Sequence, residues 1–84
     1  MAADLAVEVV SRKNTKAEIA RKLDEYFAAG TSLAWVVEPK TQTVRVYTSP
    51  RDWVVKRIGD VLDGGAVLPG FQLLVRDVFN VDCE

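Results

Sequence analysis

The sequence of 84 residues contains no histidine and a single cysteine, Cys83. Without histidine, the chain lacks the base of a Ser-His-Asp triad or a Cys-His dyad. It also lacks the side chain that most often binds metals in proteins. One cysteine cannot form an intramolecular disulfide, which is typical of a reducing compartment, so we expect a cytoplasmic protein. Any chemistry must use carboxylates, lysines, arginines and hydroxyls, together with a hard metal ion.

Charge of one sign is not in excess either, since 11 Lys and Arg residues stand against 12 Asp and Glu residues. A free-standing nucleic-acid-binding domain is normally more basic. The middle of the chain, residues 31–60, carries Lys40, Arg45, Arg51, Lys56 and Arg57 against Glu38, Asp52 and Asp60. This basic middle is compatible with a phosphate-binding surface and also with a solvated strand face.

Long hydrophobic runs are missing as well. Nothing in the sequence approaches the roughly 18 uninterrupted apolar residues of a membrane-spanning helix. Asp4 and Glu8 interrupt the apolar N-terminal stretch, which is unlike a signal peptide. We therefore expect no membrane association, and a chain this short predicts one domain over residues 1–84.

Hydrophobic periodicity predicts a strand, a helix and a second strand in the first half of the chain. The segment Leu5–Val10 is apolar on both faces apart from Glu8, which is typical of a central strand buried on both sides. The segment Leu33–Glu38 has the same character. Because a helix is predicted between them, we expect the two strands to be parallel neighbours.

The predicted helix has clear start and stop signals. Thr15 and Glu18 have the spacing of a capping box, and Gly30 follows where a C-terminal glycine cap belongs. An apolar stripe at helical spacing consists of Ile19, Leu23, Tyr26 and Phe27. Lys22 borders this stripe, since it lies three residues after Ile19 and four before Tyr26.

The second half of the chain predicts further, shorter elements. They are a half-exposed strand over Val44–Thr48 with Tyr47 toward solvent, an edge strand over Trp53–Ile58, a loop at Asp63–Gly65, a turn at Pro69–Gly70, alternation over Phe71–Val75 and a helical turn over Val75–Phe79. We expect Tyr26, Phe27, Trp35 and Trp53 in the core or at an interface rather than as platforms for base stacking. Together the elements predict an α/β or α+β fold with a mixed β-sheet and a flanking helix.

Five segments carry a resemblance to a known family. They are DLAVEVVS, RKLDEYFAAG, LAWVVEP, VRVYTS and VLPGF, in this order and at compatible spacings. Together they resemble the bacterial Uma-type restriction endonucleases of the PD-(D/E)XK nuclease superfamily, from Asp4 to Phe79. Members typically have proline before the aspartate, where this chain has Ala3, and often Ser-Pro after the strand, where this chain has Ser11-Arg12.

The resemblance implies a metal-dependent DNA endonuclease that uses Mg²⁺ or Mn²⁺. Glu8 matches the second metal-binding acid of the superfamily. The lysine expected two residues later is replaced by Val10, and Lys22 on the following helix matches the family's relocated lysine. The main-chain carbonyl of Val9 matches a further metal ligand, and Asp4 is an additional candidate.

The first acid of the superfamily pattern comes from a preceding strand that this sequence does not contain. The chain therefore resembles the C-terminal part of a restriction-endonuclease-like fold, truncated at its N-terminus. Such a truncation would leave the segment Leu5–Val10 as an unpaired edge, and unpaired edges promote association. We expect a homo-oligomer for this reason.

Each candidate residue also has a purely structural interpretation. Glu8 could pair with Lys22 or Arg12 without any catalytic role, and Lys22 could extend along the border of the core. Lys16 is a competing cation, Asp4 could be a solvated terminal residue, and Ser11 could close a turn rather than contact phosphate. At the level of the whole chain, two alternatives to an active nuclease remain: an inactive relative that dimerises, and a small interaction module.

Overall fold

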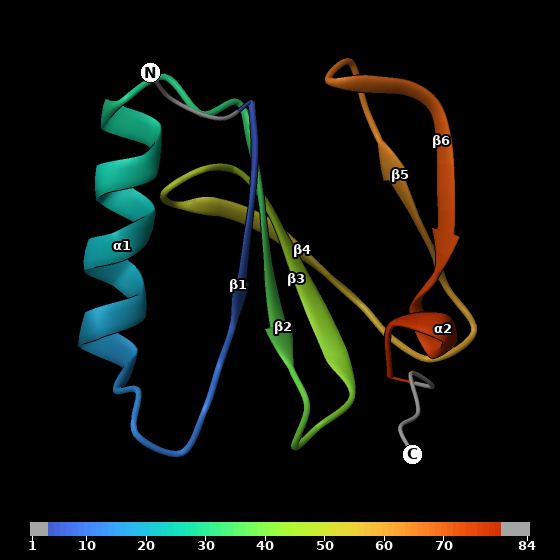
Figure 1. Ribbon diagram of the computed structural model, residues 1–84, viewed down its shortest axis with the longest axis horizontal. Helices are drawn as coiled ribbons and strands as arrows, with labels where there is room; N and C mark the ends of the chain where they lie inside the picture. The colour runs from blue at the N-terminus through green and yellow to red at the C-terminus, as the bar shows by residue number, and fades with distance from the viewer. Residues whose placement is uncertain (1–3, 80–84) are drawn as a thin grey trace.

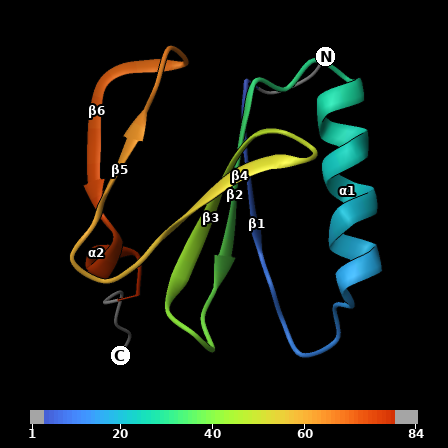
Figure 2. The same ribbon diagram turned by 180° about the vertical axis from the view of Figure 1, so that it is seen from behind.

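The computed structural model describes residues 4–79. Its elements are β1 (Leu5–Val9), α1 (Lys16–Ala28), β2 (Leu33–Glu38), β3 (Thr43–Ser49), β4 (Asp52–Lys56), β5 (Val61–Gly64), β6 (Leu68–Leu74) and α2 (Val75–Phe79). Four strands form a mixed sheet in the order β1-β2-β3-β4, and β5 and β6 form a separate two-stranded sheet. Helix α1 covers one face of the larger sheet, and the β5–β6 hairpin lies on the opposite face of this sheet (Figures 1 and 2).

The predicted fold class, a mixed sheet with a flanking helix, is confirmed. Strands β1 and β2 are parallel, with Glu8 opposite Val36, as expected for strands joined by a helical connection. The remaining pairs, β2–β3 and β3–β4, are antiparallel. No helix within residues 4–79 is long and apolar enough to cross a membrane.

Helix α1 begins at the predicted capping box. The Thr15 hydroxyl accepts a hydrogen bond from the Glu18 main-chain N–H at 3.1 Å, and the Glu18 carboxylate accepts one from the Thr15 N–H at 2.9 Å. These two bonds satisfy main-chain donors that have no partner inside the helix. After the helix, Gly30 has a φ of 106°, which glycine adopts without the steric cost of a Cβ atom.

The core lies on both faces of the sheet because strand side chains alternate. The face toward α1 holds a cluster of Ile19, Leu23, Ala34, Val36 and Tyr47. The face toward the β5–β6 hairpin holds a cluster of Leu33, Trp35, Val37, Val44, Leu62 and Val75. Trp35 also lies 6.0 Å from Phe71, measured between ring centroids. The hairpin and α2 are thus attached to the sheet mainly by apolar contacts.

The prediction that Leu5–Val10 is a central strand buried on both faces is wrong, whereas the expectation that this segment is an unpaired edge is confirmed for residues 4–79. Within residues 4–79, β1 pairs only with β2 and forms an edge of the sheet. The side chains of Val7 and Val9 are 52% and 55% exposed. The hairpin-side cluster includes Leu5 at the start of β1 but neither Val7 nor Val9. The apolar second half of β1 is therefore left uncovered on that face.

Four other expectations are corrected. Tyr47 does not point to solvent but is buried, because its side of β3 faces α1. Pro69 and Gly70 lie inside β6 rather than in a turn between elements, although Gly70 does have a positive φ of 84°. The predicted loop at Asp63–Gly65 starts later, because β5 extends to Gly64. Trp53 is 51% exposed and is not part of either core cluster.

Candidate active site

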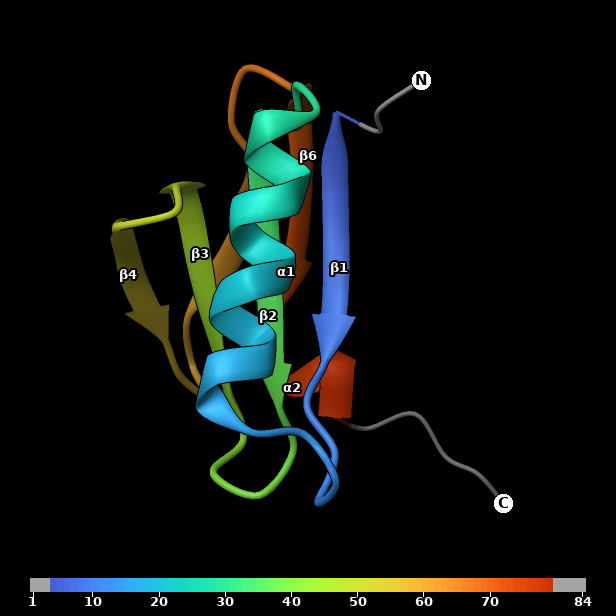
Figure 3. The same ribbon diagram turned by 90° about the vertical axis from the view of Figure 1, so that its left-hand side faces the viewer.

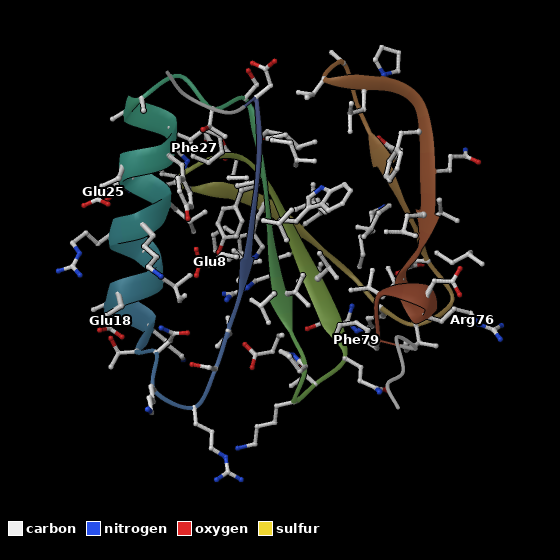
Figure 4. All side chains as sticks on the ribbon, in the orientation of Figure 1. Glu8, Glu18, Glu25, Phe27, Arg76 and Phe79 are labelled. Atoms are coloured by element: carbon white, nitrogen blue, oxygen red, sulfur yellow. The ribbon has the colours of Figure 1, made fainter. Side chains whose placement is uncertain are left out.

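Three polar side chains meet between β1 and α1. The Lys22 ammonium lies 3.0 Å from Glu8 Oε2, and the Tyr26 hydroxyl donates a hydrogen bond of 2.7 Å to Glu8 Oε1. Figure 4 shows Glu8 between the strand and the helix. Both oxygens of the carboxylate are therefore engaged by α1, one by a cation and one by a neutral donor.

The backbone explains why these side chains converge. Glu8 lies opposite Val36 in the β1–β2 register, and Val36 belongs to the core cluster under α1, so Glu8 points toward the helix. Lys22 and Tyr26 are four residues apart and therefore lie on the same side of α1. Figure 3 shows that β1 runs along one flank of this helix. The sequence separation of 14 to 18 residues is closed by the crossover from β1 to α1.

The environment keeps Glu8 ionised. The hydrogen bond from Tyr26 lowers the pKa of the Glu8 carboxyl below its ordinary value of 4.5, and the bond and charge of Lys22 lower it further, while burial opposes both. The same contact raises the pKa of Tyr26 above its ordinary value of 10.0, because the neighbouring carboxylate disfavours a phenolate. Lys22 is 39% exposed and Glu8 17% exposed, so water and ligands can reach the pair.

The structure brings together the two predicted catalytic residues, Glu8 and Lys22. Of the alternatives for the ion pair, it selects Lys22 over Arg12. Ser11 closes the predicted turn, since its N–H and its hydroxyl both donate to Asn14 Oδ1. Lys16 lies on the other flank of α1 and makes no contact with Glu8.

Tyr26 is the residue of this site that the sequence does not identify. Its spacing from Ile19 and Leu23 assigns it to the apolar stripe of the helix. Its spacing of four residues from Lys22 is the available signal, since a side chain at that position reaches whatever Lys22 reaches.

Asp4 and Glu8 are not brought together. They lie on one face of the chain, but Asp4 precedes β1, about 13 Å from Glu8 along the chain, and both oxygens of Glu8 are bound by Lys22 and Tyr26 on α1. The main-chain N–H and C=O of Val9 point away from β2. At the two ends of the β1–β2 ladder, Asp4 O accepts from Leu33 N–H and Val10 N–H donates to Val37 O, and in a parallel pair alternate residues bond to the same neighbouring strand. The Val9 carbonyl thus faces the free edge beside Glu8.

The residues of this site do not complete a magnesium site by themselves. Mg²⁺ requires six oxygen ligands in octahedral order and usually takes one or two carboxylates with retained water and substrate phosphate. Residues 4–79 contain no group of three or more Asp, Glu, Cys or His side chains that could hold a metal ion. They offer one carboxylate, Glu8, whose two oxygens already have partners, and one neighbouring main-chain carbonyl.

Comparisons with known proteins give a family match and a structural similarity. Residues 1–76 match the family model described as "Uma2: Putative restriction endonuclease". Among solved structures, the chain is similar to one described as "a putative nuclease belonging to DUF820" from Anabaena variabilis ATCC 29413, with a TM-score of 0.80 and 21% sequence identity. The similarity covers 94% of this chain but 45% of that one. None of the curated proteins matches the chain.

Proposed function

The chain belongs to the Uma2 family of restriction-endonuclease-like proteins, and from this premise we propose that it contributes to hydrolysis of phosphodiester bonds in DNA. The observation that carries the proposal is the 3.0 Å contact between Glu8 and Lys22. These are the two positions that the family resemblance assigns to catalysis, and the fold joins them across a strand and a helix.

The proposed role of Lys22 follows from its charge and its exposure. Phosphodiester hydrolysis places additional negative charge on the phosphate oxygens in the transition state, and a fixed cation stabilises that charge. Lys22 is partly exposed and held in place by Glu8, so its ammonium group can donate to a phosphate oxygen at this edge. Tyr26 keeps the Glu8 carboxylate fixed through its hydrogen bond.

A divalent ion, Mg²⁺ or Mn²⁺, is the cofactor that the family resemblance implies. We propose Glu8 and the Val9 carbonyl as the contributions of this chain, with no role for Asp4. The remaining oxygen ligands would have to come from substrate, water or residues beyond 4–79, since residues 4–79 contain no group of three or more Asp, Glu, Cys or His side chains that could hold the ion.

Cleavage of supercoiled plasmid DNA in Mg²⁺ or Mn²⁺ tests the proposal. We expect Glu8→Gln and Lys22→Met each to lower the nicking rate by about 100-fold or more, in the range found when one transition-state contact is removed. Asp24→Asn and Arg21→Met are the matched controls, because both side chains are exposed on α1 and neither takes part in the contacts of Glu8. The controls should cleave at the rate of the parent chain.

Two results would contradict the assignment. Cleavage that survives both Glu8→Gln and Lys22→Met would remove these residues from the site. A parent chain that folds but does not nick DNA with either metal would show that residues 1–84 alone are not an active nuclease.

The second candidate function is a dimerising relative without nuclease activity, and the free edge of β1 favours it. Val7 and Val9 are more than half exposed on this strand, and their peptide groups have no strand partner within residues 4–79. An uncovered apolar edge can pair with the same edge of a second copy. A homo-oligomer is therefore our proposal for the assembly state.

Light scattering and sedimentation at several concentrations test the assembly. We expect a dimer or larger species for the parent chain and a monomer for the variant Val7→Lys/Val9→Lys, because lysines on an edge strand oppose pairing. A monodisperse monomer of the parent at high concentration would refute the proposal. A dimer without nicking activity would favour the dimerising relative over the nuclease.

A further inference from the structure

A groove with a volume of about 1140 Å³ runs along the flank of α1 that faces away from Glu8. One wall is the N-terminal half of the helix, which contributes Lys16, Ile19 and Leu23. The other wall is the β3–β4 hairpin, with Pro50 and Trp53. The tip of this hairpin bends toward the helix side of the sheet in Figures 1 and 2. Figure 3 shows β4 on the opposite side of α1 from β1.

The groove concentrates positive charge in a chain whose net charge is −1. Four basic side chains line it, Arg12, Lys16, Lys40 and Arg45, against one carboxylate, Glu38. None of these four cations forms an ion pair within residues 4–79, where the ion pair is the contact between Glu8 and Lys22. A groove with several unneutralised cations attracts a polyanion.

An exposed aromatic ring lies beside these charges. Trp53 stacks on Tyr47 with ring centroids 5.5 Å apart and an angle of 28° between the rings. Tyr47 is 5% exposed, whereas Trp53 is 51% exposed, so the indole presents surface to the groove. The Arg45 guanidinium lies 5.9 Å from the centre of the Tyr47 ring. Trp53 and the Arg45 guanidinium therefore both lie against the buried Tyr47 ring.

Cations beside an exposed aromatic ring match one polymer best. Single-stranded nucleic acid offers phosphates to the cations and unpaired bases to the ring. A duplex offers the phosphates but keeps its bases stacked on each other, and an acidic peptide offers charge without bases. Trp53 therefore favours a single strand over both.

The groove also ends close to the candidate active site. Val10 lines one end of it and follows Glu8 by two residues on the same face of the chain, about 6.5 Å away along the strand. The loops that follow β1 and β2 contribute Arg12 and Lys40 at this end. A strand lying in the groove can continue past the end of β1 toward Glu8 and Lys22.

We propose that this groove binds single-stranded nucleic acid, with Trp53 stacking on a base and the four basic side chains pairing with phosphates. The inference builds on the proposed nuclease function for its choice of polymer, but binding is measurable without cleavage. It assigns to Trp53 the base-stacking role that the sequence favoured less than a core or interface position.

Fluorescence anisotropy of a labelled oligo-dT of 16 nucleotides, without divalent metal, measures the binding. Stacking of one base corresponds to roughly a 5- to 150-fold effect on affinity, so we expect Trp53→Ala to weaken binding within this range and Trp53→Phe to restore most of it. We expect Lys40→Gln/Arg45→Gln to reduce the slope of log K against log salt by about 1.4, because each cation that no longer pairs with a phosphate lowers this slope by about 0.7.

Matched controls come from the opposite face of β4. Lys56 lies opposite Val44, whose cluster faces the hairpin, whereas Trp53 lies opposite Tyr47 on the helix side. Lys56→Gln and Val54→Ala should therefore leave oligonucleotide binding unchanged. Circular dichroism establishes that each variant is folded.

Four results would overturn the inference. They are no binding by the parent at low salt, equal binding by Trp53→Ala and Val54→Ala, tighter binding of a 16-base-pair duplex than of the single strand, and displacement of the oligonucleotide by poly-glutamate of equal charge at equal concentration. Failure of the nuclease proposal looks different, since the parent and Glu8→Gln would then bind the oligonucleotide alike and neither would cleave it.

Discussion

The hydrogen bond from Tyr26 to Glu8 has a stability consequence that one substitution isolates. Tyr26→Phe removes the hydroxyl that donates to Glu8 Oε1 at 2.7 Å and keeps the ring in place. The carboxylate keeps its contact with Lys22 on the other oxygen. The substitution therefore removes one hydrogen bond to a charged group and little else.

The size of the effect follows from exposure. Hydrogen bonds to charged groups contribute roughly 1.5–3 kcal/mol to the free energy of unfolding when they are well shielded. Glu8 is 17% exposed, so water can replace part of the missing bond. We expect Tyr26→Phe to cost about 1 kcal/mol, which for a domain of this size lowers Tm by about 4–8 °C.

Urea unfolding of four proteins measures this contribution: the parent, Tyr26→Phe, Glu8→Ala and the double variant. In the Glu8→Ala background the hydroxyl has no carboxylate to bond, so Tyr26→Phe should cost close to nothing there. A cost that agrees in the two backgrounds to within about 0.3–0.5 kcal/mol would show that the residues are energetically independent, and the hydrogen bond would then have no role in stability.

Further predictions concern pH, the helix cap and the second sheet. Without divalent metal, the stabilising contribution of Glu8 should be full above pH 4.5 and be lost as pH falls through its lowered pKa. The contribution of Tyr26 should be full below pH 10.0 and be lost as pH rises through its raised pKa. A pH titration of the free energy of unfolding in which Glu8→Ala removes no acid-side dependence would contradict this. Thr15→Ala should cost about 1 kcal/mol in urea unfolding, because it removes the N-cap acceptor of α1, and an unchanged midpoint would mean that the cap is replaced by water. Leu62→Ala should cost roughly 2–5 kcal/mol, because Leu62 is 1% exposed in the cluster that joins the hairpin to the sheet, and a cost below about 1 kcal/mol would show that the hairpin is not part of the cooperative unit.

The local signals of the sequence identify most elements of this fold. The Thr15–Glu18 spacing locates the start of α1, and the β-strand character of Leu33–Glu38 gives β2 with its observed ends. These features depend on neighbouring residues, so no tertiary information is needed. The parallel pairing of β1 with β2 follows from the helix between them.

The errors arise where burial depends on distant segments. Strand β1 has the apolar composition of a buried strand. Whether Val7 and Val9 are covered depends on how far the β5–β6 hairpin extends, and this hairpin lies about 60 residues later in the chain. Tyr47 alternates like an exposed residue, and its burial is decided by α1.

In the candidate site, too, some residues can be identified from the sequence and others cannot. The family resemblance identifies Glu8 and Lys22, and their contact follows from the β1–α1 crossover. Tyr26 escapes notice because helical spacing assigns it equally well to the apolar stripe and to the neighbourhood of Lys22. The groove is assembled from loops, α1 and the β3–β4 hairpin, so the basic middle of the sequence contributes Lys40 and Arg45 but not Arg12 and Lys16.

The decisive measurement for the candidate site is the rate at which the Glu8→Gln chain nicks plasmid DNA in Mn²⁺, relative to the parent and to Asp24→Asn. We expect the parent to nick DNA, the Asp24→Asn control to nick it at the same rate, and the Glu8→Gln variant to be slower by about 100-fold or more with unchanged oligonucleotide binding. A Glu8→Gln variant that cleaves as fast as the control would contradict the assignment of the site.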